Sequence, residues 1–404
     1  MNKKLSLILG MVLLTIFLFQ CEKEKPTSLF DPDHISNLTP VITEITPPNS
    51  ALAGIVEITI SGANFSPVAK NNFVYFGKTK TAVLSATDNQ LIVQSPPIVQ
   101  DSLEVKVAVL DADLFSNILF YSLVQPVWEH GDYGEFDEPA VIACDNEENL
   151  YVAVARAKRI DKILPKGVRE TYASMSFSIP TGIKMGPEGI LYVAQKSKNI
   201  HCVLPGNTET QKIFRAPGKV NDFDFAESGV IYGGGDGDNL YLIDPSDSST
   251  EKVAEYTDIN IRTVRVFDGC VYVGGKENET GKQYIWRNQI LANNELAEKE
   301  IYFDWSEKVD PDSGVFALTF AQDGDMYIGT DKSEAIFVVH PDGSYEPLYP
   351  GILEPTSNAL CWGAGESMYV CRHKSVIIDG DRVDSKTIIK VNMLKNGAPY
   401  YGRQ

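Results

Sequence analysis

Short stretches in which apolar and polar residues alternate recur along the chain after residue 38. In Val56–Ile60 every second residue is apolar, which is the period of a strand with one buried and one exposed face. Proline, glycine and asparagine separate these stretches, as they do at turns between strands. No run has the 3.6-residue period of an amphipathic helix. The pattern predicts an all-β protein.

Residues 126–404 contain an internal repeat. An apolar residue followed by tyrosine returns every 40 to 42 residues, with one interval of 55, and a further apolar run follows each pair. The six tyrosines are Tyr151, Tyr192, Tyr232, Tyr272, Tyr327 and Tyr369. A period of about 40 residues that holds four short strands is typical of a propeller blade. The six copies predict a six-bladed β-propeller over residues 126–404.

A closed ring needs its first and last strands to pair, because open sheet edges invite aggregation. We expect Pro126–His130 to complete the blade that contains Ile388–Val391. The interval of 55 residues is longer than the others because of extra residues within Asn288–Gly314. In this segment we predict an outer strand, Glu300–Trp305, followed by a long loop.

Residues 39–125 carry the motifs of a second domain. The stretches Pro40–Pro47, Ile58–Phe65 and Leu91–Pro96 follow one another in an order that resembles the IPT/TIG domain family. The resemblance implies an immunoglobulin-like β-sandwich that acts as a spacer or contact module, with no chemistry of its own. In the propeller segment, Ile179–Ala194 resembles the NHL repeat, which implies the blade architecture and no particular activity.

The N-terminus carries a short basic stretch, Lys3-Lys4, followed by the apolar run Leu5–Phe19, which is short for a membrane-spanning helix. Leu18-Phe19-Gln20-Cys21 resembles a bacterial lipoprotein signal, which implies that Cys21 is lipidated and becomes the first residue of the mature protein. We predict a signal peptide over 1–20 and a flexible tether over 21–38. The protein would then be anchored to a membrane of the cell envelope, facing the periplasm or the cell surface. An uncleaved N-terminal anchor is the alternative.

The net charge of −18 makes nucleic acid an unlikely partner, because so acidic a surface repels phosphates. Cys144, Cys202, Cys270, Cys361 and Cys371 stand singly, without a CxxC pair or a cluster with histidine. They predict neither a zinc site nor a disulfide framework, although one disulfide remains possible in an exported chain.

Motifs of known catalytic chemistry are missing from the sequence, and its five histidines are scattered. We therefore predict no catalytic residues, no metal ligands and no cofactor. Calcium is the open alternative, since six-bladed lactonases hold this ion with acidic and amide side chains of inner strands. Asn221 and Asn358 precede such strands and are the candidates.

One pattern points to a binding surface. In a four-stranded blade, the loop after the second strand and the loop entering the first strand share one face of the propeller. Three to five residues after the repeated tyrosine, five of the six copies carry a base on this face, which would favour an anionic ligand. Trp305 is a candidate platform for a sugar ring, and a packed core position is the alternative for this residue. The predicted ligand-binding residues are Arg156, Lys196, Lys276, Trp305, Lys332, Arg372 and Lys374. Ordinary solvated turn residues are the alternative interpretation of the bases.

Two classes of function fit these patterns. The first is a non-catalytic, lipid-anchored binding protein whose propeller face captures a glycan, such as one with uronate or sulphate groups, or a protein partner. The second is a metal-dependent propeller enzyme of the lactonase or lyase type. The absence of a metal-ligand constellation in the sequence favours the binding protein.

Replacing Cys21 by serine tests the predicted anchor. Cys21→Ser removes the only thiol that can carry the lipid, so metabolic labelling with palmitate should be lost and the chain should remain unprocessed or leave the membrane fraction. Cys270→Ser is the matched control and should label like the wild type. Labelling that persists in Cys21→Ser would contradict the lipoprotein interpretation.

Overall fold

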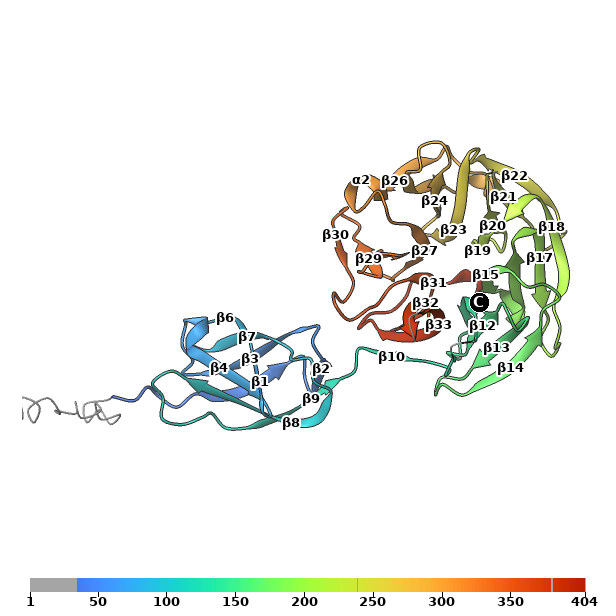
Figure 1. The fold of residues 1–404 in the computed structure, drawn as a ribbon. Helices are drawn as coiled ribbons and strands as arrows, with labels where there is room; N and C mark the ends of the chain where they lie inside the picture. The colour runs from blue at the N-terminus through green and yellow to red at the C-terminus, as the bar shows by residue number, and fades with distance from the viewer. Residues whose placement is uncertain (1–34, 135, 238, 379–380, 404) are drawn as a thin grey trace, which may run out of the picture. The chain divides into compact units, whose positions relative to one another are not determined.

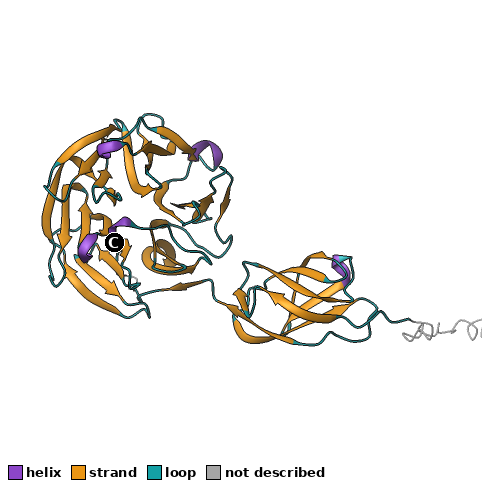
Figure 2. Ribbon diagram, turned by 180° about the vertical axis from the view of Figure 1, so that it is seen from behind, coloured by secondary structure: helices purple, strands orange, loops and turns teal. Residues whose placement is uncertain are grey.

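The computed structural model describes residues 35–134, 136–237, 239–378 and 381–403. The predicted signal peptide, Cys21 and most of the predicted tether lie outside these ranges. The chain divides into two compact units, Met1–Leu123 and Val124–Gln404. Both are built almost entirely of β-strands, as predicted (Figures 1 and 2). None of the helices in the described ranges is long and apolar enough to cross a membrane.

The N-terminal unit is an immunoglobulin-like sandwich of two antiparallel sheets. One sheet has the order β1 (Val41–Thr46), β3 (Glu57–Ala63), β7 (Gln90–Gln94) and β6 (Val83–Ala86). The other has the order β2 (Ser50–Leu52), β9 (Leu119–Val124), β8 (Gln100–Val109), β4 (Asn72–Phe76) and β5 (Thr79–Thr81), with the short helix η1 (Ala69–Asn71) before β4. The alternation in β3 is confirmed, since Ile58 and Ile60 are fully buried between the sheets.

The end of β3 shows why a glycine stands there. A Cβ atom on Gly62 would lie 1.9 Å from the carbonyl oxygen of Val41 and 2.5 Å from the ring of Phe65. The missing side chain therefore lets β1 approach and lets Phe65 enter the core. Asn64 adopts a positive φ of 63°, and its side chain donates a hydrogen bond to the carbonyl of Thr39.

Val124–Gln404 forms a six-bladed β-propeller (Figure 1). In the described residues each blade is a four-stranded antiparallel sheet, whose strands run in order from the innermost to the outermost. Blade 1 consists of β11 (Pro139–Cys144), β12 (Leu150–Val154), β13 (Arg159–Ile163) and β14 (Arg169–Ser174). Blade 2 consists of β15 (Pro180–Met185), β16 (Leu191–Gln195), β17 (Ser197–Val203) and β18 (Gln211–Val220). Blade 3 consists of β19 (Asp222–Phe225), β20 (Ile231–Gly234), β21 (Asn239–Ile243) and β22 (Thr250–Glu255).

Blades 4 to 6 complete the ring. Blade 4 consists of β23 (Ile259–Phe267), β24 (Cys270–Glu277), β25 (Gln283–Gln289) and β26 (Glu300–Asp304). Blade 5 consists of β27 (Val315–Phe320), β28 (Met326–Thr330), β29 (Ile336–Val339) and β30 (Tyr345–Pro347). Blade 6 consists of β31 (Ser357–Trp362), β32 (Ser367–Ile378), β33 (Asp381–Asn392) and β10 (Val127–Glu129). Short helices lie in the connections: η2 (Pro187–Gly189), η3 (Ala292–Asn294), α2 (Trp305–Lys308) and η4 (Tyr401–Arg403). The six repeated tyrosines all lie in second strands and are buried.

The ring closes as the sequence predicted. Strand β10 pairs antiparallel with β33, with Val127 opposite Val391 and Glu129 opposite Ile389. The long interval between blades 4 and 5 also contains the predicted outer strand, but β26 ends at Asp304 and Trp305 begins α2. The Asp304 carboxylate accepts a hydrogen bond from the backbone N–H of Glu307 at 2.9 Å, and this cap starts the helix.

A feature that the sequence did not reveal is the path of the C-terminal segment. After β33 the chain turns to the middle of the ring, in both views (Figures 1 and 2). The backbone of Asn396 and Ala398 bonds to Gln322 and Phe320 at the end of β27. The Lys395 ammonium lies 2.7 Å from Asp323 and 2.6 Å from Asp325, and Gly397 packs against Trp362. The segment therefore covers one end of the central channel.

Deleting residues 394–404 should lower the melting temperature by several degrees without preventing folding. The deletion removes these bonds and the burial of Tyr401 but no blade strand, so we expect a loss of about 2 to 4 kcal/mol. Differential scanning calorimetry measures the shift. Lys395→Met, which removes only the ion pairs with Asp323 and Asp325, should have a smaller effect. An unchanged melting temperature in the deletion would show that the segment does not stabilise the ring.

Candidate ligand-binding site

The repeat itself defines the lining of the central channel. Each repeated tyrosine pairs across the sheet with an inner-strand residue, and these six partners all face one cavity: Ala143, Lys184, Asp224, Arg265, Thr319 and Cys361. The residues two positions earlier form a second layer, which lines a second pocket: Val141, Gly182, Asp222, Thr263, Ala317 and Ala359. The charged members of both layers come from blades 2, 3 and 4.

Asp222 is the centre of this charged cluster. Its carboxylate lies 3.0 Å from the Lys184 ammonium and 2.8 Å from the Arg265 guanidinium, and it accepts a hydrogen bond from the backbone N–H of Val264. Burial alone would raise the pKa of Asp222, but the two neighbouring cations outweigh this effect and lower it. A Cβ on Gly182 would lie 2.8 Å from the carboxylate, so glycine leaves the room that the ion pairs need.

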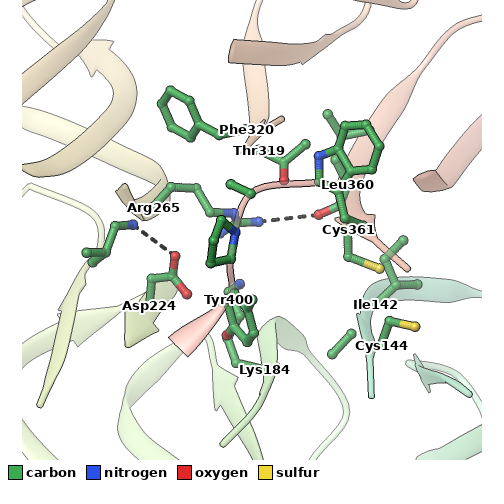
Figure 3. A pocket seen from close by; sticks show the side chains of 15 residues that line it. Ile142, Cys144, Lys184, Asp224, Arg265, Thr319, Phe320, Leu360, Cys361 and Tyr400 are labelled. Atoms are coloured by element: carbon green, nitrogen blue, oxygen red, sulfur yellow. Dashed lines mark hydrogen bonds between the residues drawn. The ribbon is translucent and has the colours of Figure 1, made fainter. Parts of the chain in front are cut away.

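Asp224 faces the deeper cavity, which we call the capped cavity (Figure 3). It has a volume of about 50 Å³ and is covered by Ala398–Tyr400 of the C-terminal segment. One carboxylate oxygen of Asp224 accepts from the backbone N–H of Val266 at 2.9 Å. The other is buried without a hydrogen-bond partner among the described residues, and burial raises the pKa of this carboxyl group.

At the other end of the strands the channel opens into a small pocket of about 30 Å³, which we call the mouth. Its rim consists of half-buried side chains, Thr181, Arg262, Phe316 and Asn358, and its floor includes the Asp222 cluster. The Arg262 guanidinium carbon lies 4.7 Å from the centroid of the Phe316 ring. Gly314 makes room for this stack, because a Cβ there would lie 2.8 Å from Nη1 of Arg262 and 2.7 Å from the Phe316 ring.

Several buried polar atoms without a hydrogen-bond partner in the described structure lie at the ends of strands on the face of the mouth, and others lie elsewhere in the propeller. The atoms on this face include Oγ1 of Thr181, Oδ1 of Asn221, Nη1 of Arg262, Oγ of Ser357 and Nε of Arg372. Buried polar groups in proteins are nearly always hydrogen-bonded, and an unpaired one costs about 1 to 3 kcal/mol. Of these residues, Thr181 and Arg262 line the mouth, where a polar ligand or ordered water can complete the bonding.

The predicted bases lie on the same face as the mouth, and they differ in solvent exposure and in whether they form ion pairs. Arg156 and Lys196 are exposed and Lys276 is half-buried. Lys332 lies 2.6 Å from Asp310, so the loop after one second strand contacts the loop entering the same blade. Arg372 is buried and lies near two acids, 3.3 Å from Glu354 and 3.7 Å from Glu129. The side chain of Lys374 lies outside the described residues. Two of the bases are thus neutralised by acids of the protein.

The prediction that Trp305 offers a platform for a sugar ring is wrong. Trp305 is fully buried, and its indole N–H donates to Ser313 while its ring meets Phe337 edge-on. The sequence pattern placed Trp305 at the end of an exposed outer strand. The strand ends one residue earlier, and the helical turn α2 directs the indole into the core instead.

The two asparagines named for calcium lie at the rim of the channel. The Asn221 amide donates to Asp236 at 2.6 Å and to the carbonyl of Ile261 at 3.1 Å, and its own oxygen is unpaired among the described residues. Asn358 lines the mouth. Within the described ranges, no three histidine, cysteine, aspartate or glutamate side chains are grouped so that they could hold a metal ion. Calcium binding by the asparagines remains a prediction.

Comparison with known proteins supports the architecture. Residues 40–122 match the IPT/TIG domain family, and no curated protein matches the chain. A Bacteroides thetaiotaomicron protein assigned provisionally as a phosphatase has a similar structure, with 14% identity, a TM-score of 0.56 and coverage of 90% of this chain and 98% of its own. An auxiliary nutrient binding protein from the same species shows 13% identity, a TM-score of 0.50 and coverage of 90% and 99%.

A luciferin-regenerating enzyme has a similar structure over a smaller part of this chain. It has 13% identity and a TM-score of 0.51, and the alignment covers 68% of this chain and 97% of the enzyme. At such low identity these similarities show the fold alone. The protein therefore combines an IPT/TIG domain with a six-bladed β-propeller. Its function has to be argued from its own side chains.

Asp222→Asn should destabilise the propeller strongly. The variant leaves the buried Lys184 and Arg265 charges without their acid partner, and breaking a buried ion pair in this way costs about 3 to 5 kcal/mol. Urea unfolding at pH 7 measures the loss, and Glu170→Gln on the exposed side of β14 is the matched control. A loss below about 1 kcal/mol would contradict the role given to the cluster.

The loss of stability in Asp222→Asn should depend on pH. Because the pKa of Asp222 is lowered in the folded protein, its stabilising effect is present above the ordinary aspartate pKa of about 3.9 and is lost as the pH falls through the lower folded value. The difference in unfolding free energy between wild type and Asp222→Asn should therefore shrink below about pH 4. A difference that stays constant down to about pH 2.5 would show that Asp222 is not held ionised.

Proposed function

We propose that this protein is a non-catalytic binding protein of the bacterial cell envelope, which captures an anionic glycan at the mouth of its propeller. One observation carries the proposal. Arg262 stands half-buried at the rim, its guanidinium forms no ion pair with an acid in the described structure, and Phe316 supports its flat side. Such a group is prepared to bind an acidic ligand from solution.

The chemistry of the rim suits an acidic sugar. A guanidinium binds carboxylate or sulphate oxygens through two parallel hydrogen bonds, and an aromatic ring behind it limits its motion. Thr181 and Asn358 offer a hydroxyl and an amide for sugar hydroxyl groups. The mouth itself is small, with a volume of about 30 Å³. It therefore accepts the acidic group of a sugar, while the sugar ring stays outside at the rim.

Acids also lie near Arg262, and they are engaged elsewhere. Asp331 accepts a hydrogen bond from the backbone N–H of Gly314, and Asp236 accepts from Asn221. Both raise the pKa of Arg262, but burial has the larger effect and lowers it. The exposed Arg156 and Lys196 on the same face provide further positive charges for neighbouring acidic residues of a longer glycan.

The placement in the envelope rests on other support. The sequence around Cys21 resembles a lipoprotein signal, and an auxiliary nutrient binding protein shares the fold. A lipid anchor at Cys21 would hold the protein at a membrane, and the IPT/TIG domain would serve as a spacer. An acidic protein partner is the alternative ligand for the same mouth.

Arg262→Gln tests the binding site. A charge-assisted hydrogen bond contributes about 1.5 to 3 kcal/mol, so the variant should bind oligosaccharides with uronate or sulphate groups roughly 10- to 150-fold more weakly in isothermal titration calorimetry. Its melting temperature should change little, because no side-chain acceptor in the described structure is lost. The matched control is Arg215→Gln on the exposed side of β18, which should bind like the wild type.

Three results would contradict the proposal. The first is equal binding of acidic glycans by Arg262→Gln and wild type. The second is binding of an acidic peptide but of no glycan, which would assign the mouth to a protein partner. The third is hydrolysis or elimination of a bound glycan or lactone that metal chelators abolish, which would identify an enzyme.

A further inference from the structure

A larger hollow lies at the opposite end of the strands, between blades 4 and 5. It has a volume of about 580 Å³, and five of its twelve lining residues are aromatic. Tyr272 and Phe320 form the buried floor, while Phe267, Tyr302 and Tyr401 are half-buried at its sides. We call this hollow the groove. It shares no lining residue with the mouth, and it adjoins the capped cavity, with which it shares Phe320 and Pro399.

We propose that the groove is a second binding site, for a neutral oligosaccharide chain. Sugar rings present apolar C–H faces and a rim of hydroxyl groups, so their binding sites combine exposed aromatic faces with polar side chains at the edge. The groove offers this combination over a length greater than the mouth provides. The ligand and the face both differ from those of the acidic-glycan site at Arg262.

The aromatic side chains are fixed in place before any ligand binds. Phe267 stacks in parallel on Phe320, with ring centroids 4.5 Å apart and an angle of 8° between the planes. Tyr302 meets Tyr272 edge-on at 5.1 Å. Because Phe267 and Tyr302 each rest on a floor ring, stacking of a sugar would require little ordering of these two side chains.

The charges around the groove disfavour an anion. The Arg287 guanidinium lies over the Tyr302 ring and forms an ion pair with Glu300, so this cation is already neutralised. Lys395 nearby is held between Asp323 and Asp325. The exposed Asp268 and Gln322 remain at the edge as hydrogen-bonding groups for hydroxyls, and Asp268 adds negative charge. A neutral chain avoids the repulsion that a uronate would meet.

The C-terminal segment contributes one side of the groove. Pro399 and Tyr401 line it, and the same segment is bonded to β27 through Ala398 and Phe320. The groove is therefore complete only when the segment is docked. Deleting residues 394–404 should remove oligosaccharide binding even if the propeller itself stays folded.

The test is a titration of the intact ectodomain with neutral tetra- to hexasaccharides of glucose, mannose, galactose and xylose. We expect at least one of these chains to bind, and Phe267→Ala and Tyr302→Ala to weaken its binding about tenfold or more. Phe136→Ala removes an exposed aromatic ring outside the groove and should leave the affinity unchanged. Gln322→Ala changes only an exposed polar side chain and should weaken binding several-fold with an unchanged melting temperature.

Arg262→Gln separates this proposal from the acidic-glycan site, because it should leave binding of the neutral chain unchanged. The proposal is overturned if none of the four sugars binds, or if Phe267→Ala, Tyr302→Ala and Gln322→Ala all bind the chain like the wild type. It is also overturned if a proline-rich peptide, and no sugar, binds in a manner that Tyr302→Ala abolishes. Loss of neutral-chain binding in Arg262→Gln alone would place that chain at the mouth instead.

Discussion

The structure depends on one constraint: a four-stranded blade cannot bury both of its faces alone, so each blade is stable only between two neighbours. Buried clusters accordingly run from blade to blade, as where Tyr327 of blade 5 packs with Trp362 of blade 6. The ring is closed only if its last blade has all four strands and can pack against the first blade. Strand β10 supplies the missing outer strand of blade 6 by pairing with β33. The channel and both of its ends exist because this ring closes.

Closure brings the inner strands together, and the side chains they carry then determine what each end can do. Asp222 joins cations from blades 2 and 4, and the cluster separates the mouth from the capped cavity. On one side, Arg262 forms no ion pair with an acid in the described structure and suits an acidic ligand. On the other, the C-terminal segment covers the channel and leaves the aromatic groove beside it. The two proposed sites thus differ in chemistry because the two ends of the strands differ in sequence.

The sequence predicted architecture better than it predicted the site. Alternation and the repeated tyrosines were sufficient for the all-β fold, the six blades and the closing strand. Trp305 shows where local patterns fail, since a single capped turn moved it from an expected surface to the core. Arg372 shows the same limit for electrostatic interactions. The sequence placed a base at this position of the repeat, but it did not show that Glu129 and Glu354, from other parts of the chain, lie close enough to neutralise it.

The sequence by itself determined the period of the blades. It also contained a signal for the channel lining that our predictions did not use, because the inner-strand partner of each repeated tyrosine stands seven or eight residues before it. Lys184, Asp224 and Arg265 can be found by that count as charges in strands expected to be buried. Only the tertiary structure decided which charges pair, that Arg262 keeps an unpaired nitrogen against Phe316, and that residues 393–403 cover the channel. The reason is physical: strand periodicity is a local property of the chain, whereas neutralisation and burial depend on side chains that only ring closure brings within contact distance.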